Sequence, residues 1–117
     1  MLGKVHEGVV LLTEVGQIVA DTWAAIEDRF PEVGVDTHVV MPDHIHAIVW
    51  IDCDAWISLG RVVGTFKGLS ARRVHAAWGR VGGAFWQRGY HDHVIRNTLD
   101  LARCRQYITD NPRQWVP

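Results

Sequence analysis

The sequence is poor in cysteine and lacks a long apolar stretch, and both features limit what the protein can be. Two cysteines occur in 117 residues, with no CxxC spacing, so neither a disulfide framework nor a cysteine zinc site is indicated. No run of about 18 uncharged apolar residues is present, and no membrane partner is expected. The first ten residues contain Lys4, His6 and Glu7 where a signal peptide needs its apolar stretch, which predicts a cytoplasmic location.

Repeats, linkers and low-complexity segments are also lacking. We therefore expect one globular domain over residues 1–117, with a single core. Hydrophobic residues make up 48% of the chain and charged residues 21%, a balance typical of a folded protein and not of a disordered tail.

Acidic residues are absent between Ala55 and His91, although the net charge of the chain is only -1. Residues 1–54 hold ten acids against two basic side chains, whereas residues 55–117 hold ten basic side chains against three acids. A half dominated by arginine is typical of a surface that binds a polyanion such as nucleic acid. The alternative is a solvated helix surface that the acidic half neutralises.

Hydrophobic periodicity predicts an α+β alternation. Residues 33–40 and 44–51 are rich in β-branched side chains and should form a strand hairpin. The other expected elements are strands at 4–5, 9–13, 84–88 and 91–96, and helices at 14–30, 55–78 and 99–111. Thr13 and Thr98 are expected as N-caps, and Pro112 should end the last helix.

The segment His44-Ile45-His46 alternates histidine, apolar and histidine within the second strand of the predicted hairpin. Side chains at i and i+2 of a strand project to one face about 7 Å apart, so two imidazoles can converge on one divalent ion. Ile45 should point into the opposite layer. Two histidines at the edge of the core are the alternative. A magnesium or manganese ion would need a further oxygen ligand from elsewhere in the chain.

The predicted last helix carries Tyr107 and Asn111, four residues apart. This spacing places both on one helical face, with Arg103 a turn earlier, and that face can point toward the histidines. Together they offer a nucleophile and an oxygen donor. In the alternative, Tyr107 is a half-buried aromatic residue and Asn111 only ends the helix.

Six short segments, in order along the chain, resemble segments of one protein family. They are Val39-Val40-Met41-Pro42, Met41-Pro42-Asp43-His44-Ile45-His46, Gly64-Thr65-Phe66-Lys67, Phe85-Trp86-Gln87-Arg88, His93-Val94-Ile95-Arg96 and Tyr107-Ile108-x-x-Asn111-Pro112. The segment that ends in the histidine pair resembles the MPNHxH signature of the HUH single-tyrosine transposases, in particular the REP-associated tyrosine transposases. The resemblance covers nearly the whole chain. It implies a ferredoxin-like antiparallel sheet that carries the histidine pair, helices packed on one face, and the tyrosine on a C-terminal helix.

The resemblance also implies a metal-dependent transposase that cleaves single-stranded DNA and transfers the strand. His44, His46 and Asn111 would hold a divalent cation, Mg or Mn, acting as a Lewis acid on the scissile phosphate. The hydroxyl of Tyr107 would attack phosphorus, expel a 3′-hydroxyl and leave a 5′-phosphotyrosine for rejoining. Because the ordinary pKa of tyrosine is about 10, the metal and cations such as Arg103 would have to activate this hydroxyl.

The DNA itself is expected to be single-stranded or hairpin-forming, and the chain to act as a monomer or homodimer. The side chains expected to contact DNA are Lys67, Arg72, Arg73, Arg96 and Arg103, with Trp86 as a stacking platform for an unpaired base. Ordinary packing in the core is the alternative for Trp86.

The chain departs from the family in two places. Family members usually carry a further N-terminal strand with histidine and threonine before the segment that here begins at Leu2, so the first strand is expected to be missing. The true start would then lie upstream, or a partner chain would complete the sheet, or the activity would be reduced. Asp43 stands where the family more often has asparagine, and we expect little effect from this change.

Three functions from different classes are compatible with these residues. A transposase-like enzyme is favoured because the tyrosine, the asparagine and both histidines are present. A catalytically idle DNA-binding domain derived from such an enzyme predicts binding without cleavage. A metal-dependent hydrolase that uses the histidine pair and a water nucleophile predicts cleavage even in Tyr107→Phe.

Overall fold

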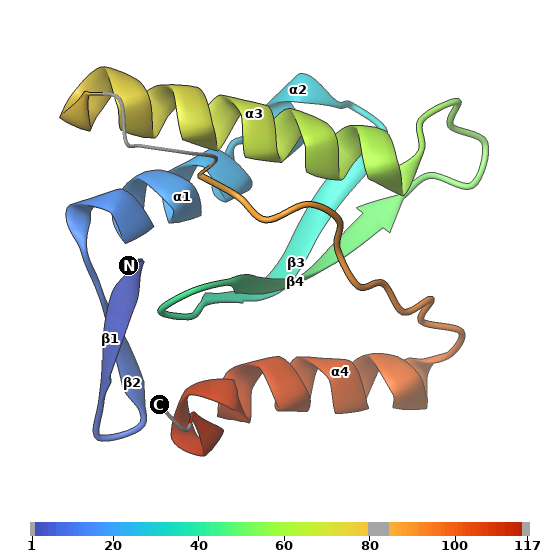
Figure 1. Ribbon diagram of the computed structural model, residues 1–117. Coiled ribbons are helices and arrows are strands. Elements are labelled where there is room, and N and C mark those ends of the chain that lie inside the picture. Colours follow the sequence, from blue (N-terminus) through green and yellow to red (C-terminus); the bar gives the residue numbers. More distant parts are fainter. Residues whose placement is uncertain (1, 80–84, 116–117) are drawn as a thin grey trace.

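The computed structural model describes residues 2–79 and 85–115, and it places a strand hairpin between helices (Figure 1). The strands are β1 (Gly3–His6), β2 (Val9–Leu12), β3 (Val33–Val40) and β4 (Ile45–Ile51). The helices are α1 (Glu14–Ala24), α2 (Ile26–Arg29), α3 (Leu59–Trp78) and α4 (Thr98–Asp110), followed by the 3-10 helix η1 (Asn111–Gln114). The predicted α+β class is confirmed.

The strands form two antiparallel pairs. β1 pairs with β2 so that Gly3 lies opposite Leu12, and β3 pairs with β4 so that Val33 lies opposite Ile51. Across residues 2–79 and 85–115, no ladder of hydrogen bonds joins these pairs into one sheet. The continuous ferredoxin-like sheet implied by the family resemblance is therefore present here as two separate hairpins.

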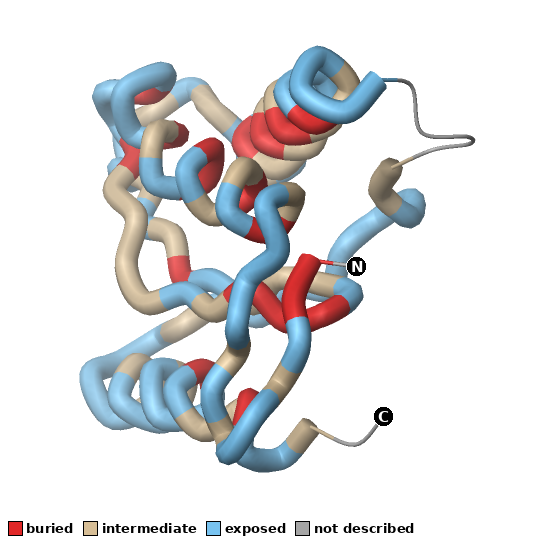
Figure 2. The backbone as a smooth tube through the Cα atoms, turned by 90° about the vertical axis from the view of Figure 1, so that its left-hand side faces the viewer, coloured by how far each residue is buried: buried red, intermediate tan, exposed pale blue. Residues whose placement is uncertain are grey.

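The core lies between α1, α2, α3 and one face of the β3–β4 hairpin, and Figure 2 shows buried residues on the segments that face it. Thr13 caps α1 as predicted, because its side chain accepts a hydrogen bond from the amide of Gly16. Instead of one helix over residues 14–30, the chain has a short interruption at Ala25. Trp23 and Ile26, on either side of it, are both buried.

Helix α3 crosses α1 and completes this core. It begins at Leu59, later than predicted, because the hydroxyl of Ser58 accepts from the amide of Arg61 at 3.1 Å and acts as the N-cap. Phe66, in the middle of α3, packs edge-on against Trp23 with ring centroids 5.2 Å apart. This contact fixes α3 over α1 and leaves the opposite face of the β3–β4 hairpin for another helix.

Helix α4 occupies that opposite face, so the helices cover both faces of the hairpin rather than one (Figure 1). Its N-cap is Asn97, one residue before the predicted Thr98, because the Asn97 side chain accepts from the amide of Asp100 at 2.8 Å. Ile108 of α4 is buried, and so is Pro112 of the following η1. Most of α4 is exposed (Figure 2), and its polar side chains are therefore available for function.

The prediction of strands at 84–88 and 91–96 is wrong for the residues that the structure describes, because residues 85–97 form no strand. Ala84 lies outside the described residues. A side chain of α3 supplies hydrogen bonds that a neighbouring strand would otherwise give to this segment. The ammonium group of Lys67 donates to the carbonyls of Gln87 at 2.9 Å and Gly89 at 2.6 Å. These carbonyls have their partners on α3 and not on a neighbouring strand.

Candidate active site at the histidine pair

The histidines stand at a turn held by buried residues. Met41 is fully buried, and its amide donates to the carbonyl of His44 at 2.7 Å, which closes the turn between β3 and β4. Pro42 is also fully buried, and its carbonyl accepts from the amide of Leu2 at 2.8 Å. The backbone that carries His44 is therefore fixed from both sides.

The two imidazoles converge. Nε2 of His44 lies 3.0 Å from Nε2 of His46, and the ring planes are nearly perpendicular at 89°. His44 immediately precedes β4, which begins at Ile45, and both imidazoles turn toward the same point. Ile45 packs against the core on the other side, as the alternation predicted.

The imidazole of His46 is half-buried. Burial lowers the pKa of His46, and the nearby charge of His44 lowers it further. The neutral imidazole that this favours at neutral pH carries a lone pair, which a metal ligand requires. On the other edge of the His44 ring, Nδ1 lies 2.5 Å from Oδ1 of Asp43.

This donor set fits a divalent cation. Two nitrogens bound to one ion at about 2.1 Å, at roughly a right angle, would be about 3.0 Å apart. The observed separation of the two Nε2 atoms is 3.0 Å. Imidazoles alone are poor partners for magnesium, so a hard ion would also use oxygen donors from a nearby side chain, solvent or a bound phosphate.

Tyr107 lies beside this pair. Its ring contacts the ring of His46 edge-on, with centroids 5.6 Å apart and planes at 83°. The side chain is 55% exposed, so a substrate can reach it. The ring of Trp115, just after η1, lies 6.2 Å from that of His44. Helix α4 and the segment after it thus bring two aromatic residues to the histidines of the hairpin.

An ion pair that sequence reasoning missed holds α4 in this position. Asp36 of β3 accepts from Nε of Arg105 at 3.0 Å and from Nη2 at 2.7 Å. Its second oxygen also accepts from the indole of Trp50 on β4 at 2.8 Å. Arg105 comes two residues before Tyr107. No sequence pattern links residues 69 positions apart, so only the structure could identify this contact.

The Asp36 contact predicts a pH dependence of stability. Hydrogen bonds from Arg105 first, and from Trp50 second, hold the pKa of Asp36 well below its ordinary value. The folded chain then binds fewer protons than the unfolded chain, whose aspartates titrate near pH 4. This contribution is therefore fully present above about pH 4 and is lost as the pH falls further.

The measurement is urea unfolding between pH 7 and pH 2, comparing the native chain with Asp36→Asn. The variant should be less stable at pH 7, and the difference should shrink as the pH falls below about 4. A difference that stays constant with pH would show that the Asp36 charge does not stabilise the docking of α4.

The structure places the remaining predicted site residues of α4 around Tyr107. Asn111 is the first residue of η1, half-buried, one turn beyond Tyr107. Arg103 is exposed one turn before it. Helical spacing puts both on the side of the helix that carries the tyrosine, and their roles at the site stay a prediction.

The residues expected to contact DNA fall into two groups. Arg72 and Arg96 are exposed. Lys67 is held by the two carbonyls described above, and Nη1 of Arg73 donates to the hydroxyl of Thr22 at 3.2 Å. Trp86 packs against Phe66 with centroids 5.5 Å apart, and its indole donates to the hydroxyl of Ser70 at 2.8 Å. Lys67, Arg73 and Trp86 thus hold structural elements together in the free protein.

Two further groups of metal-ligand side chains lie close together within the described residues. One consists of Asp52, Cys53 and Asp54, all exposed, and the other of His93, Asp100 and Cys104. In the second group, one carboxylate oxygen of Asp100 accepts from the amide of Arg96 at 3.4 Å and lies 2.9 Å from Nε2 of His93, and the other accepts from the thiol of Cys104 at 3.9 Å. These bonds connect the loop before α4 to the first turn of the helix, so the group has a structural role.

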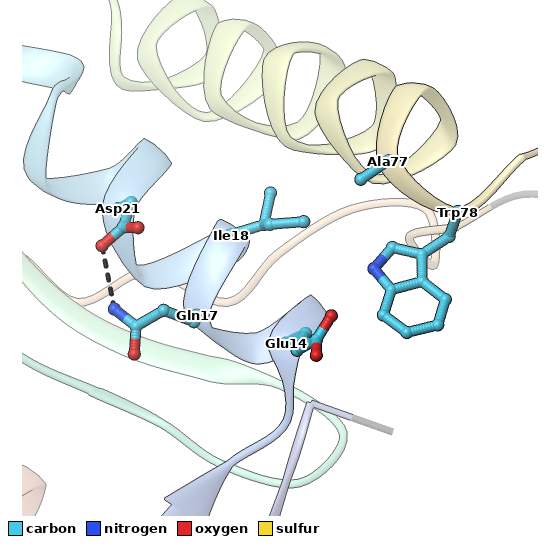
Figure 3. Close-up of a pocket in the computed structure, with 6 residues that line it drawn as sticks. All are labelled: Glu14, Gln17, Ile18, Asp21, Ala77 and Trp78. Carbon is cyan, nitrogen blue, oxygen red and sulfur yellow. Dashed lines mark hydrogen bonds between the residues drawn. The ribbon is translucent and has the colours of Figure 1, made fainter.

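A surface pocket lies where α1 and α3 adjoin, and Figure 3 shows the side chains around it. Its lining residues are Glu14, Gln17, Ile18, Asp21, Ala77 and Trp78. The amide of Gln17 donates to Asp21 at 2.9 Å across its rim. Neither the histidine turn nor α4 contributes to this pocket, so it is separate from the candidate active site.

Comparison with known proteins assigns the chain to the DNA transposases. The histidine pair and its adjacent tyrosine already indicated this class. The family described as "Transposase IS200 like" matches residues 9–111. The chain belongs to this IS200-like transposase family, whose members process DNA.

One relative is a protein of Haemophilus influenzae named only as an uncharacterized protein. It is 29% identical over 133 residues, which cover 98% of this chain and 74% of the relative. No solved structure matches the chain. None of the helices within residues 2–79 and 85–115 combines the length and apolar character needed to cross a membrane.

Proposed function

We propose that this chain cleaves single-stranded DNA and transfers the cut strand through a covalent bond to Tyr107. His44, His46 and Asn111 would hold a divalent cation, Mg or Mn, beside the scissile phosphate. The observation that carries the proposal is the contact between Tyr107 and His46, whose ring centroids are 5.6 Å apart, next to a histidine pair with Nε2 atoms 3.0 Å apart.

The reaction exchanges one phosphate ester for another. The phenolic oxygen of Tyr107 attacks phosphorus, the bond from phosphorus to the 3′-oxygen breaks, and the phenolic proton passes to the departing oxygen. The products are a free 3′-hydroxyl and a 5′-phosphotyrosine. Attack by another 3′-hydroxyl on this ester joins the strands and restores the tyrosine. The bound cation would supply Lewis-acid stabilisation of charge on the phosphate.

Exposed arginine side chains can position the DNA. Arg103 lies one turn before the tyrosine, and Arg72 and Arg96 are also exposed, so we propose all three as contacts to the DNA backbone. The side chains of Lys67, Arg73 and Trp86 would have to exchange internal hydrogen bonds for contacts with DNA. We therefore expect them to contribute less to DNA binding than the three exposed arginines.

The test is a denaturing protein gel after incubation with end-labelled single-stranded DNA that contains candidate hairpins. With Mn or Mg, the native chain should give a labelled covalent band that EDTA prevents. The band should be absent in Tyr107→Phe because phenylalanine has no hydroxyl, while gel-shift binding of the DNA should remain.

The chain offers a matched control in Tyr90, its only other tyrosine, which is 47% exposed. Tyr90→Phe should form the adduct like the native chain. Binding of DNA by the native chain without any adduct would favour a catalytically idle DNA-binding domain. Cleavage that persists in Tyr107→Phe would favour a hydrolase with a water nucleophile.

A further inference from the structure

Asp43 stands next to the histidine pair in the turn between β3 and β4. Its side chain is 65% exposed, yet Oδ1 lies 2.5 Å from Nδ1 of His44. This contact is on the ring edge opposite to Nε2, the atom that approaches His46. The carboxylate of Asp43 thus contacts the pair directly but is separated from Nε2 of His44 by the imidazole ring itself.

We propose that Asp43 is a positioning residue that fixes the proton of His44 on Nδ1 and so turns the lone pair of Nε2 toward the ion shared with His46. The inference rests on the proposed function and assigns a role to a residue that does not touch the ion or the DNA.

The chemistry of the groups supports this assignment. A neutral imidazole carries one N–H, and only its other nitrogen can bind a metal. An ionised carboxylate can only accept hydrogen bonds, so the nitrogen that faces Oδ1 of Asp43 must be the one that carries the proton. Nε2 of His44 is then the ligand atom. An anionic acceptor on Nδ1–H also raises the basicity of the metal-binding nitrogen, as in carboxylate–histidine–metal arrangements.

The turn keeps Asp43 in place for this role. Met41 and Pro42 are fully buried immediately before it, and the amide of Met41 donates to the carbonyl of His44. The carboxylate is therefore held beside the ring by adjacent backbone. A side chain that reached the ring from a distant element would lose more conformational freedom on making the same contact.

Metal affinity provides the first test. Mn²⁺ is titrated calorimetrically into the full chain at pH 8, with the native protein compared with Asp43→Ala, Asp43→Asn and His44→Ala. Asp43→Ala should weaken binding about 10- to 100-fold, and Asp43→Asn, which keeps an acceptor oxygen but no charge, should fall between this variant and the native chain. His44→Ala should show no measurable binding.

A matched control is Asp28→Ala, which removes one negative charge from an exposed position in α2. Its Mn²⁺ affinity should stay within about twofold of the native value because a distant exposed charge is screened. The second measurement is the nitrogen NMR of the histidine rings in the metal-free chain. His44 should carry its proton on Nδ1 in the native protein, and Asp43→Ala should shift that proton toward Nε2.

The outcomes separate this inference from the proposed function. Native-like Mn²⁺ affinity and an unchanged His44 proton in Asp43→Ala would overturn the inference and leave the metal site intact. Equal losses in Asp43→Ala and Asp28→Ala would also overturn it, since net charge would explain both. If the native chain does not bind Mn²⁺, the metal site of the proposed function fails, and the role of Asp43 fails with it.

Discussion

Replacement of His46 by alanine is expected to abolish both Mn²⁺ binding and the covalent adduct with DNA. His46 is the residue that joins the two parts of the site, because its Nε2 lies 3.0 Å from that of His44 and its ring contacts Tyr107. Alanine leaves a single imidazole, which holds a divalent ion only weakly. Calorimetric Mn²⁺ titration and the denaturing-gel assay measure the two effects on the same preparation.

His38→Ala is the matched control because it removes a histidine from the neighbouring strand. His38 pairs with Ala47, whereas His46 pairs with Val39, so alternation directs the two side chains to opposite faces of the hairpin. The control should retain Mn²⁺ binding and adduct formation. Equal losses in both variants would mean that the hairpin as a whole, rather than the histidine pair, supports the activity.

The local features of the site could be predicted from the sequence because they depend on neighbours in the chain. Alternation in the strand correctly placed Ile45 in the core, and hydrophobic periodicity predicted the helix that carries Tyr107. The cap at Thr13 likewise follows from a short pattern and is confirmed. Each of these depends on geometry that repeats every two to four residues.

The features that could not be predicted depend on contacts between distant residues. The Asp36–Arg105 ion pair, which joins α4 to β3, has no repeating signal in the sequence. The segment after α3 has the apolar composition of strands. Its Phe85 and Trp86 instead pack against the core, and Lys67 accounts for two of its carbonyls. Composition indicated the burial of these residues but not their backbone partners.

Gly16→Ala is expected to be the most destabilising small change outside the active site. A Cβ at Gly16 would lie 1.8 Å from the carbonyl oxygen of Leu2, far inside van der Waals contact. That carbonyl also accepts from the amide of Thr13 at 3.0 Å and from its hydroxyl at 3.1 Å, so it cannot move without losing both bonds. Overpacking together with lost hydrogen bonds should cost about 3 kcal/mol, and the melting temperature should fall by roughly 10 °C or more.

Gly68→Ala is the matched control, because it makes the same change in another helix without a nearby carbonyl. A Cβ at Gly68 of α3 would meet nothing within 4 Å, so only the helix preference of alanine remains, and the variant should be about 0.5–1 kcal/mol more stable than the native chain. Thermal melts of the two variants should therefore shift in opposite directions. The same shift in both would mean that the Leu2 carbonyl does not press against α1.

Because the amide of Leu2 also donates to the carbonyl of Pro42, Gly16→Ala should in addition loosen the histidine turn and weaken Mn²⁺ binding, whereas Gly68→Ala should not.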